Sequence, residues 1–170
     1  MKRNLIVISM AALAMATAQA GNPKSEAAAG PAAFARLKTL VGEWQGDTPM
    51  GKVHASYELI AGGTSLVVKE SGDKMPAMLT VFYLDGDRLM LTHYCMAGNQ
   101  PRMQARAFNS ETGEVDFQFL DATNLDNPGA GHMHNARIRL ADSDHYSDEW
   151  GFFENGKAKM THAAQYTRIK

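Results

Sequence analysis

The chain has a single cysteine, Cys95, among its 170 residues, so no disulfide can form within it. It also has no basic patch that would favour nucleic acid and no acidic run that would form a charged tail. Its apolar run at residues 5–16 is too short to cross a bilayer as a helix. The fold must therefore be held together by packing alone, and nucleic acid is not an expected partner.

The first 20 residues have the form of a bacterial export signal. Lys2 and Arg3 provide a basic start before the apolar run, and Ala18-Gln19-Ala20 fits a small-x-small cleavage site. No cysteine stands directly after that site, so a lipid anchor is not expected. We therefore expect residues 1–20 to be a signal peptide. The mature protein would be exported to the periplasm or the extracellular space, with no membrane span.

The mature chain has the length of one domain. The 150 residues that follow Ala20 can bury a single core, and the loss of the two basic signal residues leaves 15 basic against 18 acidic residues, a net charge of −3. Residues 21–30 are small and polar without apolar periodicity, and they predict a flexible tether. Residues 31–170 are the predicted barrel domain, which begins with a short helix over residues 31–41.

From Gly42 onward, apolar and polar residues alternate with a period of two, which is typical of strands. Turn signals such as Asp85-Gly86-Asp87 and Asn155-Gly156 are short enough to force neighbouring strands to run antiparallel. The ten predicted strands are residues 42–48, 52–60, 64–70, 77–84, 88–95, 103–109, 114–120, 133–140, 145–154 and 157–168. The pattern predicts an all-β fold: an up-and-down antiparallel β-barrel of about ten strands, with the N-terminal helix closing one end.

The connections of such a barrel alternate between its two ends, and their lengths differ between the ends. One end receives the short turns near residues 61–63, 85–87, 110–113 and 141–144. The other end receives residues 49–51, 71–76, 96–102, 121–132 and 155–156, which include every long loop. Because loops on a rigid scaffold commonly carry function, the long-loop end is the predicted mouth of the barrel.

Gly42-Glu43-Trp44, which follows the short helix, resembles the Gly-x-Trp opening of lipocalins and related calycin barrels. The resemblance implies that Trp44 packs at the closed end against an arginine of the last strand, where Arg168 lies in this sequence. Ten strands without a disulfide resemble the fatty-acid-binding-protein or nitrobindin-like branch. Over residues 42–168, with its THYC and GNQPRM runs, the chain is similar to uncharacterised secreted bacterial proteins of calycin-like type, which implies no activity.

The alternation also assigns the side chains that face the barrel interior. Either face of residues 88–95 could point inward, and we favour the face that carries His93. His93 and His134 would then lie near the mouth and His162 deeper in the barrel. The other residues predicted to face the interior are Phe117, Phe119, Asp148, Trp150 and Phe152. Apolar walls with a few convergent polar groups are typical of small-molecule sites, so the pattern predicts a ligand cavity.

The run from Leu91 to Met103, LTHYCMAGNQPRM, gathers hydrogen-bonding groups where an apolar strand reaches the predicted mouth. That concentration favours ligand contact, although the same groups could instead bond to one another in a core strand. The expected ligand-binding residues are Thr92, His93, Tyr94, Cys95, Asn99, Arg102, His134, Trp150, Phe152 and His162. Of these, Arg102 could meet an anionic head group or could pair with Asp121 at the rim.

The histidines leave a metal alternative open. His132 and His134 lie on one face of an extended segment, a spacing that can bind zinc, and His93 or His162 could supply a third nitrogen. An inward histidine in an apolar barrel could also hold a haem iron. The sequence contains no motif that confirms either cofactor, so none is expected.

An enzyme is the second alternative. His93 with Cys95 or Tyr94 could carry isomerase or hydrolase chemistry, but no third, orienting group can be assigned, and a buried inert thiol is the simpler account of Cys95. A structural domain with a filled barrel is the third alternative. We expect an exported protein without a catalytic residue, whose partner is a small apolar or amphipathic molecule bound in the barrel cavity.

Overall fold

The computed structural model describes residues 29–48 and 51–170, so the predicted signal peptide and most of the predicted tether lie outside the described residues. Helix α1 spans Ala29–Leu37 and continues into a 3-10 turn, η2 (Lys38–Leu40), and a second such turn is η3 (Ala61–Gly63). The strands are β1 (Gly42–Thr48), β2 (Gly51–Ile60), β3 (Ser65–Gly72), β4 (Met75–Asp85), β5 (Arg88–Tyr94), β6 (Gln100–Asn109), β7 (Glu114–Thr123), β8 (His132–Leu140), β9 (His145–Glu154) and β10 (Lys157–Arg168). No helix in these two ranges is long and apolar enough to cross a membrane.

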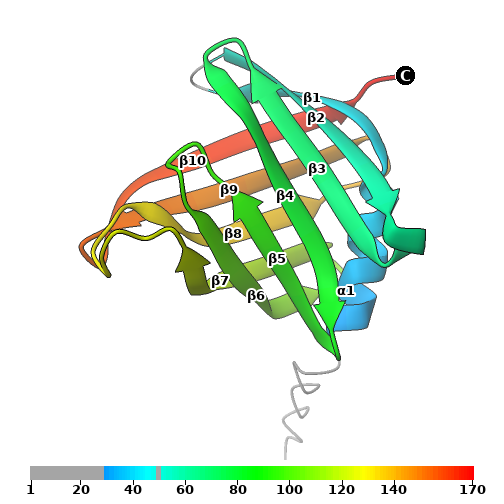
Figure 1. Cartoon of the computed structure of the whole chain (residues 1–170). Coiled ribbons are helices and arrows are strands. Elements are labelled where there is room, and N and C mark those ends of the chain that lie inside the picture. Colours follow the sequence, from blue (N-terminus) through cyan, green and yellow to red (C-terminus); the bar gives the residue numbers. More distant parts are fainter. Residues whose placement is uncertain (1–28, 49–50) are drawn as a thin grey trace, which may run out of the picture.

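The ten strands close into one antiparallel barrel (Figure 1). Each strand pairs with its neighbours in the sequence, and β1 pairs with β10, placing Trp44 opposite Arg168 and Asp47 opposite Gln165. The predicted up-and-down barrel is therefore confirmed, with each strand within a few residues of its expected position. Closure matters physically because it leaves neither β1 nor β10 as an open edge where another chain could pair.

Helix α1 packs at the end of the short turns, against β4, β5 and β6. Figure 1 shows this helix (blue) at one end of the barrel and the loop over residues 124–131 (yellow) at the opposite end. Gly30 lies so close to the β4–β5 turn that a β-carbon would collide with the carbonyl oxygen of Asp87. Helix α1 begins at Ala29, two residues before the expected start of the helix at residue 31.

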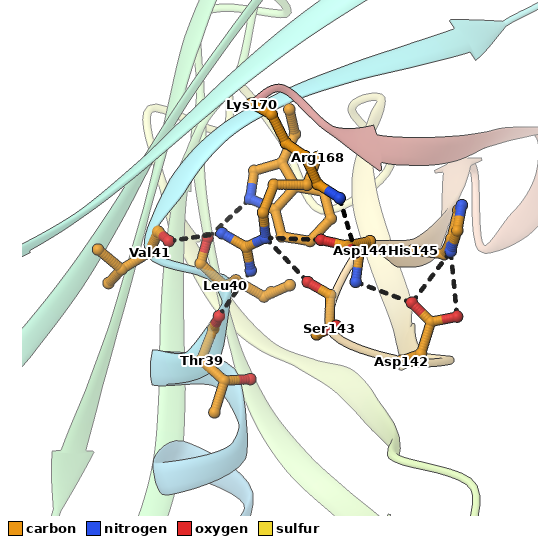
Figure 2. Close-up of polar contacts among 10 residues, drawn as sticks. Thr39, Leu40, Val41, Asp142, Ser143, Asp144, His145, Arg168 and Lys170 are labelled. Carbon is orange, nitrogen blue, oxygen red and sulfur yellow. Dashed lines mark hydrogen bonds and ion pairs between the residues drawn. The ribbon is translucent and has the colours of Figure 1, made fainter.

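The closed end is sealed around Trp44. Its indole is fully buried, its Nε1 donates a hydrogen bond to the carbonyl of Leu40 at 2.7 Å, and the guanidinium of Arg168 lies 4.1 Å from its ring centroid. Arg168 also donates to three backbone carbonyls, those of Thr39, Val41 and Ser143 (Figure 2). One side chain of the last strand therefore joins the helix end, the start of β1 and the β8–β9 turn. The packing of Arg168 on Trp44 is the one contact that was expected here.

The half of the barrel next to this floor is filled with apolar side chains. They alternate with exposed residues along each strand, as the period of two requires. The largest of them are Phe82, Leu89, Leu91, Met103, Val115, Phe117, Ile138 and Leu140, all at most 2% exposed. The alternative of a filled barrel is therefore correct for this half of the interior.

Strand pairing is incomplete toward the long-loop end. β5 pairs with β6 only through residues 90–92, and β7 pairs with β8 only as far as Gln118 opposite Asn135. A bulge in β8 between Met133 and Asn135 shifts the alternation there. Met133 consequently faces the interior, and His134 lies on the outer wall beside Gln118 and Asn135. The predicted inward orientation of His134 is wrong, because an inserted residue reverses the faces beyond it.

Loss of the Arg168 guanidinium should destabilise the barrel. We expect Arg168→Met to lower the free energy of unfolding by about 3 kcal/mol, because it removes three charge-assisted hydrogen bonds to carbonyls and the contact with the Trp44 ring, partly discounted for solvent exposure. Urea denaturation at pH 7 measures the change. The matched control is Arg139→Met, on the exposed outer face of β8, which should change the stability by less than about 0.5 kcal/mol. Equal losses in both variants would contradict the role assigned to Arg168.

Candidate functional site

A cavity of about 340 Å³ occupies the long-loop half of the barrel. Since a cavity of about 150 Å³ can bind benzene, this one can hold a ligand of roughly a dozen heavy atoms. Its lining residues are Thr48, Val53, Glu70, Met75, Met78, His93, Met96, Met133, Asp148, Trp150, Met160, Thr161, His162, Ala163, Ala164 and Tyr166. Two depressions of about 480 and 370 Å³ lie on the outer wall beside exposed charges such as Lys52 and Arg137, so the interior cavity is the candidate site.

Methionines form much of the wall of this cavity and of its opening. Those that line it are Met75, Met78, Met96, Met133 and Met160. Met96 and Met160 are also 63% and 50% exposed, so the cavity reaches solvent beside them. Flexible, polarizable thioethers adapt to ligands of different shape. The opening therefore lies at the end that the loop lengths indicate, and its rim is apolar and deformable.

Two buried carboxyl groups form the polar floor of the cavity. Glu70 of β3 and Asp148 of β9 are 7% and 8% exposed, and none of the lining residues is a lysine or an arginine. Tyr166 connects the pair, since its hydroxyl donates to Oε1 of Glu70 at 2.8 Å and also contacts Asp148. The indole Nε1 of Trp150 donates to Oδ2 of Asp148 at 3.3 Å.

The environment of the two carboxyl groups favours their neutral forms. Burial raises the pKa of Asp148 well above its usual value, and the nearby Glu70 raises it further, against the lowering effect of the Trp150 hydrogen bond. Burial likewise raises the pKa of Glu70, opposed by the hydrogen bond from Tyr166. Two carboxylates without a cation in a low-dielectric site cannot both ionise at ordinary pH. Burial and mutual repulsion therefore favour a state of the pair in which at least one carboxyl group keeps its proton.

A layer of tyrosines separates this polar floor from Trp44. Tyr146 stacks on Tyr166 with ring centroids 4.3 Å apart, and it meets the Trp44 ring edge-on at 4.8 Å. The hydroxyl of Tyr57 donates to that of Tyr146 at 3.3 Å. Burial raises the pKa of all three phenols, so they remain neutral hydrogen-bonding groups. The layer supports the carboxyl groups from below and excludes water from that side.

His93 is the third polar group of the cavity, and it is almost completely buried. Its Nδ1 shares a hydrogen bond of 2.9 Å with Oγ1 of Thr80, and its ring lies 4.8 Å from that of Trp150. Burial lowers the pKa of His93 to about 4, so the imidazole is neutral at pH 7. Its Nε2 is buried without a hydrogen-bond partner in the described part of the chain. Because buried polar atoms are normally satisfied, this nitrogen points to a missing partner.

Three of the ten residues expected to bind a ligand line the cavity, namely His93, Trp150 and His162. The structure therefore resolves the two possible faces of β5 in favour of the His93 face. Thr92 and Tyr94 consequently lie on the outer face of that strand, where Tyr94 is 48% exposed. Phe152 is partly buried against the core and close to Gly131, outside the cavity lining.

Asn99 and Arg102, which follow β5, do not line the cavity and bond to other parts of the protein. The side-chain amide of Asn99 donates to the carbonyl of Gly131 at 2.8 Å, which ties the loop after β5 to the loop before β8. Arg102 pairs with Asp121 at the exposed rim, its Nε donating at 2.6 Å. Of the two roles open to Arg102, the structure therefore supports the ion pair with Asp121 and not contact with a ligand head group.

His132 and His134 form a ring cluster on the wall where β7 and β8 separate. Nε2 of His132 and Nδ1 of His134 share a hydrogen bond of 3.0 Å, and the His134 ring stacks between Phe119 and Phe153, with centroids 5.0 and 4.4 Å away. Burial, and secondarily the neighbouring His132, lowers the pKa of His134. The two histidines therefore bond to each other and pack against aromatic rings, and they fill the space where β7 and β8 separate.

The metal and enzyme alternatives gain no geometric support. No group of three or more His, Cys, Asp and Glu side chains comes together as a metal site within residues 29–48 and 51–170, so the histidine set is not assembled. Cys95 is buried, which raises the pKa of its thiol and disfavours the reactive thiolate. The hydrogen bond of His93 goes to Thr80, and neither Cys95 nor Tyr94 is its partner.

Sequence reasoning missed Glu70 and gave Asp148 no role beyond facing inward. The signal for Glu70 was available, because it follows Leu66 and Val68 at a spacing of two on the buried face of β3. A charged residue at an inward position is expensive to bury and therefore indicates a specific environment. Asp148 has Glu149 as its sequence neighbour, but its partner in space is Glu70, on a strand that is not adjacent to β9 in the sheet.

Comparison with known proteins adds little to this site. The sequence matches no family model and none of the curated proteins. Among solved structures, the chain is similar to a protein of unknown function from the DUF3598 family of Nostoc punctiforme, with 11% sequence identity and a TM-score of 0.49. The similarity covers 78% of this chain and 49% of the other, so this chain spans about half the length of that protein.

His93 should make the barrel less stable in mild acid. The imidazole pKa falls from about 6.5 in the unfolded chain to about 4 in the native state. The unfolded chain therefore binds the extra proton first, and native stability is lost as the pH falls from 6.5 through 4. We expect the wild-type protein to lose about 3 kcal/mol relative to His93→Gln over this interval. Urea denaturation at pH 7 and pH 4 measures the difference, and parallel pH profiles for the two proteins would contradict it.

Proposed function

We propose that the chain binds a small, largely apolar molecule non-covalently inside the barrel, with a polar group of the ligand directed at Glu70, Asp148 and His93. The observation that carries this proposal is a cavity of about 340 Å³ whose lining brings the buried side chains of Glu70, Asp148 and His93 together with apolar side chains. An apolar wall with a few convergent polar groups is the usual composition of a small-molecule site. The methionine rim supplies a route from solvent that needs no large movement of the barrel.

The closed end of the barrel around Trp44 supports a calycin-type relationship, which is part of this proposal. Trp44 lies at the start of β1 behind a short helix, and Arg168 of the last strand covers its ring. In calycin barrels this arrangement closes the end opposite the ligand. The same division is proposed here, with Trp44 and Arg168 serving the fold and the opposite half of the barrel serving the ligand.

We also propose that the protein acts after export, on the basis of the basic, apolar and small-x-small segments of residues 1–20. Expression of the full chain in a bacterial host should give a periplasmic or secreted protein whose N-terminal residue is Gly21. Cell fractionation followed by N-terminal sequencing checks both points. Accumulation of a cytoplasmic protein that still carries Lys2 and Arg3 would contradict the export proposal.

A neutral probe tests the cavity itself. We expect 4-phenylbutan-1-ol, which has 11 heavy atoms, to bind with a stoichiometry of one and a Kd on the order of 0.1 mM, at about 0.5 kcal/mol per heavy atom. Ala164 lines the cavity and is 6% exposed, so Ala164→Phe should place a ring in the ligand volume and weaken binding at least tenfold. Isothermal titration calorimetry measures both proteins.

The matched control is Thr167→Phe, which adds a ring to the exposed outer face of the same strand. This variant should bind 4-phenylbutan-1-ol as the wild-type protein does. Thermal unfolding of all three proteins checks that the added ring has not disrupted the barrel. Equal affinities for the Ala164→Phe and Thr167→Phe proteins, or no binding by the wild-type protein, would contradict a ligand site in this cavity.

A further inference from the structure

The acidic side chains at the polar floor of the cavity have no basic side chain of lysine or arginine to balance them. The floor contains two buried acidic side chains, Glu70 and Asp148, and no lysine or arginine lines the cavity. Two imidazoles also line the cavity, those of His93 and His162, and burial keeps the His93 imidazole neutral at pH 7. A buried carboxyl group without a cation is a net cost to folding. A cation that arrives with a ligand would offset this cost.

We propose that this cavity recognises an ammonium group, so that its ligand class is a small apolar amine. The inference rests on the proposed function, because it names the polar group of the ligand that the same cavity binds. The inference follows from three features of the cavity: its two acidic side chains, its hydrogen-bond acceptors, and its apolar and aromatic walls.

The acceptors match the donors of a primary ammonium. An R–NH₃⁺ group has three N–H donors and no acceptor. Carboxyl oxygens of Glu70 and Asp148, two side chains of the cavity lining, provide acceptors for these donors. The hydrogen bond of 2.9 Å between Nδ1 of His93 and Oγ1 of Thr80 holds the imidazole beside them on the lining.

The walls suit the remainder of an amine better than they suit a bare metal ion. The Trp150 indole, a ring type that attracts ammonium groups, belongs to the cavity lining and lies 4.8 Å from the His93 ring. Methionine thioethers surround the opening and accommodate an apolar tail. Hard divalent cations need six or more oxygen ligands, which this apolar wall does not supply. A fatty-acid head group would add a third carboxyl to the floor, so anions are disfavoured.

Binding of an ammonium should be linked to loss of a proton. One carboxyl group of the pair ionises to match the incoming charge, and its proton leaves to the solvent while the amine stays protonated. The titratable groups that face the pair are Tyr57 from β2, His93 from β5, Tyr146 from β9, and His162 and Tyr166 from β10. The three phenols and the buried His93 stay neutral at pH 7, so they do not supply the released proton.

Three probes of one size test the inference by calorimetry on the mature protein: 4-phenylbutylamine, 4-phenylbutan-1-ol and 4-phenylbutanoate. At pH 8 the amine should bind at least tenfold more tightly than the alcohol, and the acid should bind most weakly. The affinity of the amine should rise from pH 6 to pH 8, whereas that of the alcohol should stay constant. Titrations in buffers of different ionisation enthalpy should show proton release for the amine alone.

Glu70→Gln and Asp148→Asn are nearly isosteric and should reduce the preference for the amine over the alcohol to less than threefold. If either variant fails to fold, the pH dependence and the proton release of the wild-type protein decide the question without it. Alcohol binding equal to amine binding would overturn the ammonium inference and leave the cavity intact as a ligand site. Failure of all three probes to bind would instead overturn the proposed function.

Discussion

The pairing of β1 with β10, fixed by Arg168 over the Trp44 ring, is the constraint on which the rest of the structure depends. It converts an open meander into a ring and seals one end with apolar packing. Because the chain contains no disulfide, that packing must supply the stability. Because the half of the barrel next to Trp44 contains the core, the opposite half can remain hollow. That half holds the cavity, whose largely apolar wall includes a few polar groups.

The cavity costs stability in two ways. Glu70 and Asp148 lose their hydration on burial, and the Nε2 of His93 has no hydrogen-bond partner among residues 29–48 and 51–170. The Tyr57, Tyr146 and Tyr166 layer limits this cost with hydrogen bonds and stacked rings. Groups with strongly perturbed pKa values in a cavity are typical of functional sites, since a purely structural interior would replace them with apolar side chains.

The sequence predicts the barrel well because its signals are local. Strict alternation and turns such as Asn155-Gly156, whose residues adopt φ of 52° and 69°, determine the strands and their direction. The site depends on two features that local patterns do not encode. The bulge beside Met133 moves His134 to the outer wall. Glu70 and Asp148 come from strands that are far apart in the sheet and share Tyr166 as a neighbour, a proximity that no spacing along the chain indicates.

The central claim is that the interior holds a carboxyl pair that keeps a proton at neutral pH because no cation accompanies it. Carbon-13 NMR of the side-chain carboxyl groups, followed from pH 3 to pH 9 in ligand-free protein and assigned with Asp148→Asn, tests it most directly. The account predicts that the Asp148 carboxyl group is still protonated at pH 7. Ionisation of both Glu70 and Asp148 near pH 4, as for exposed carboxyl groups, would contradict it.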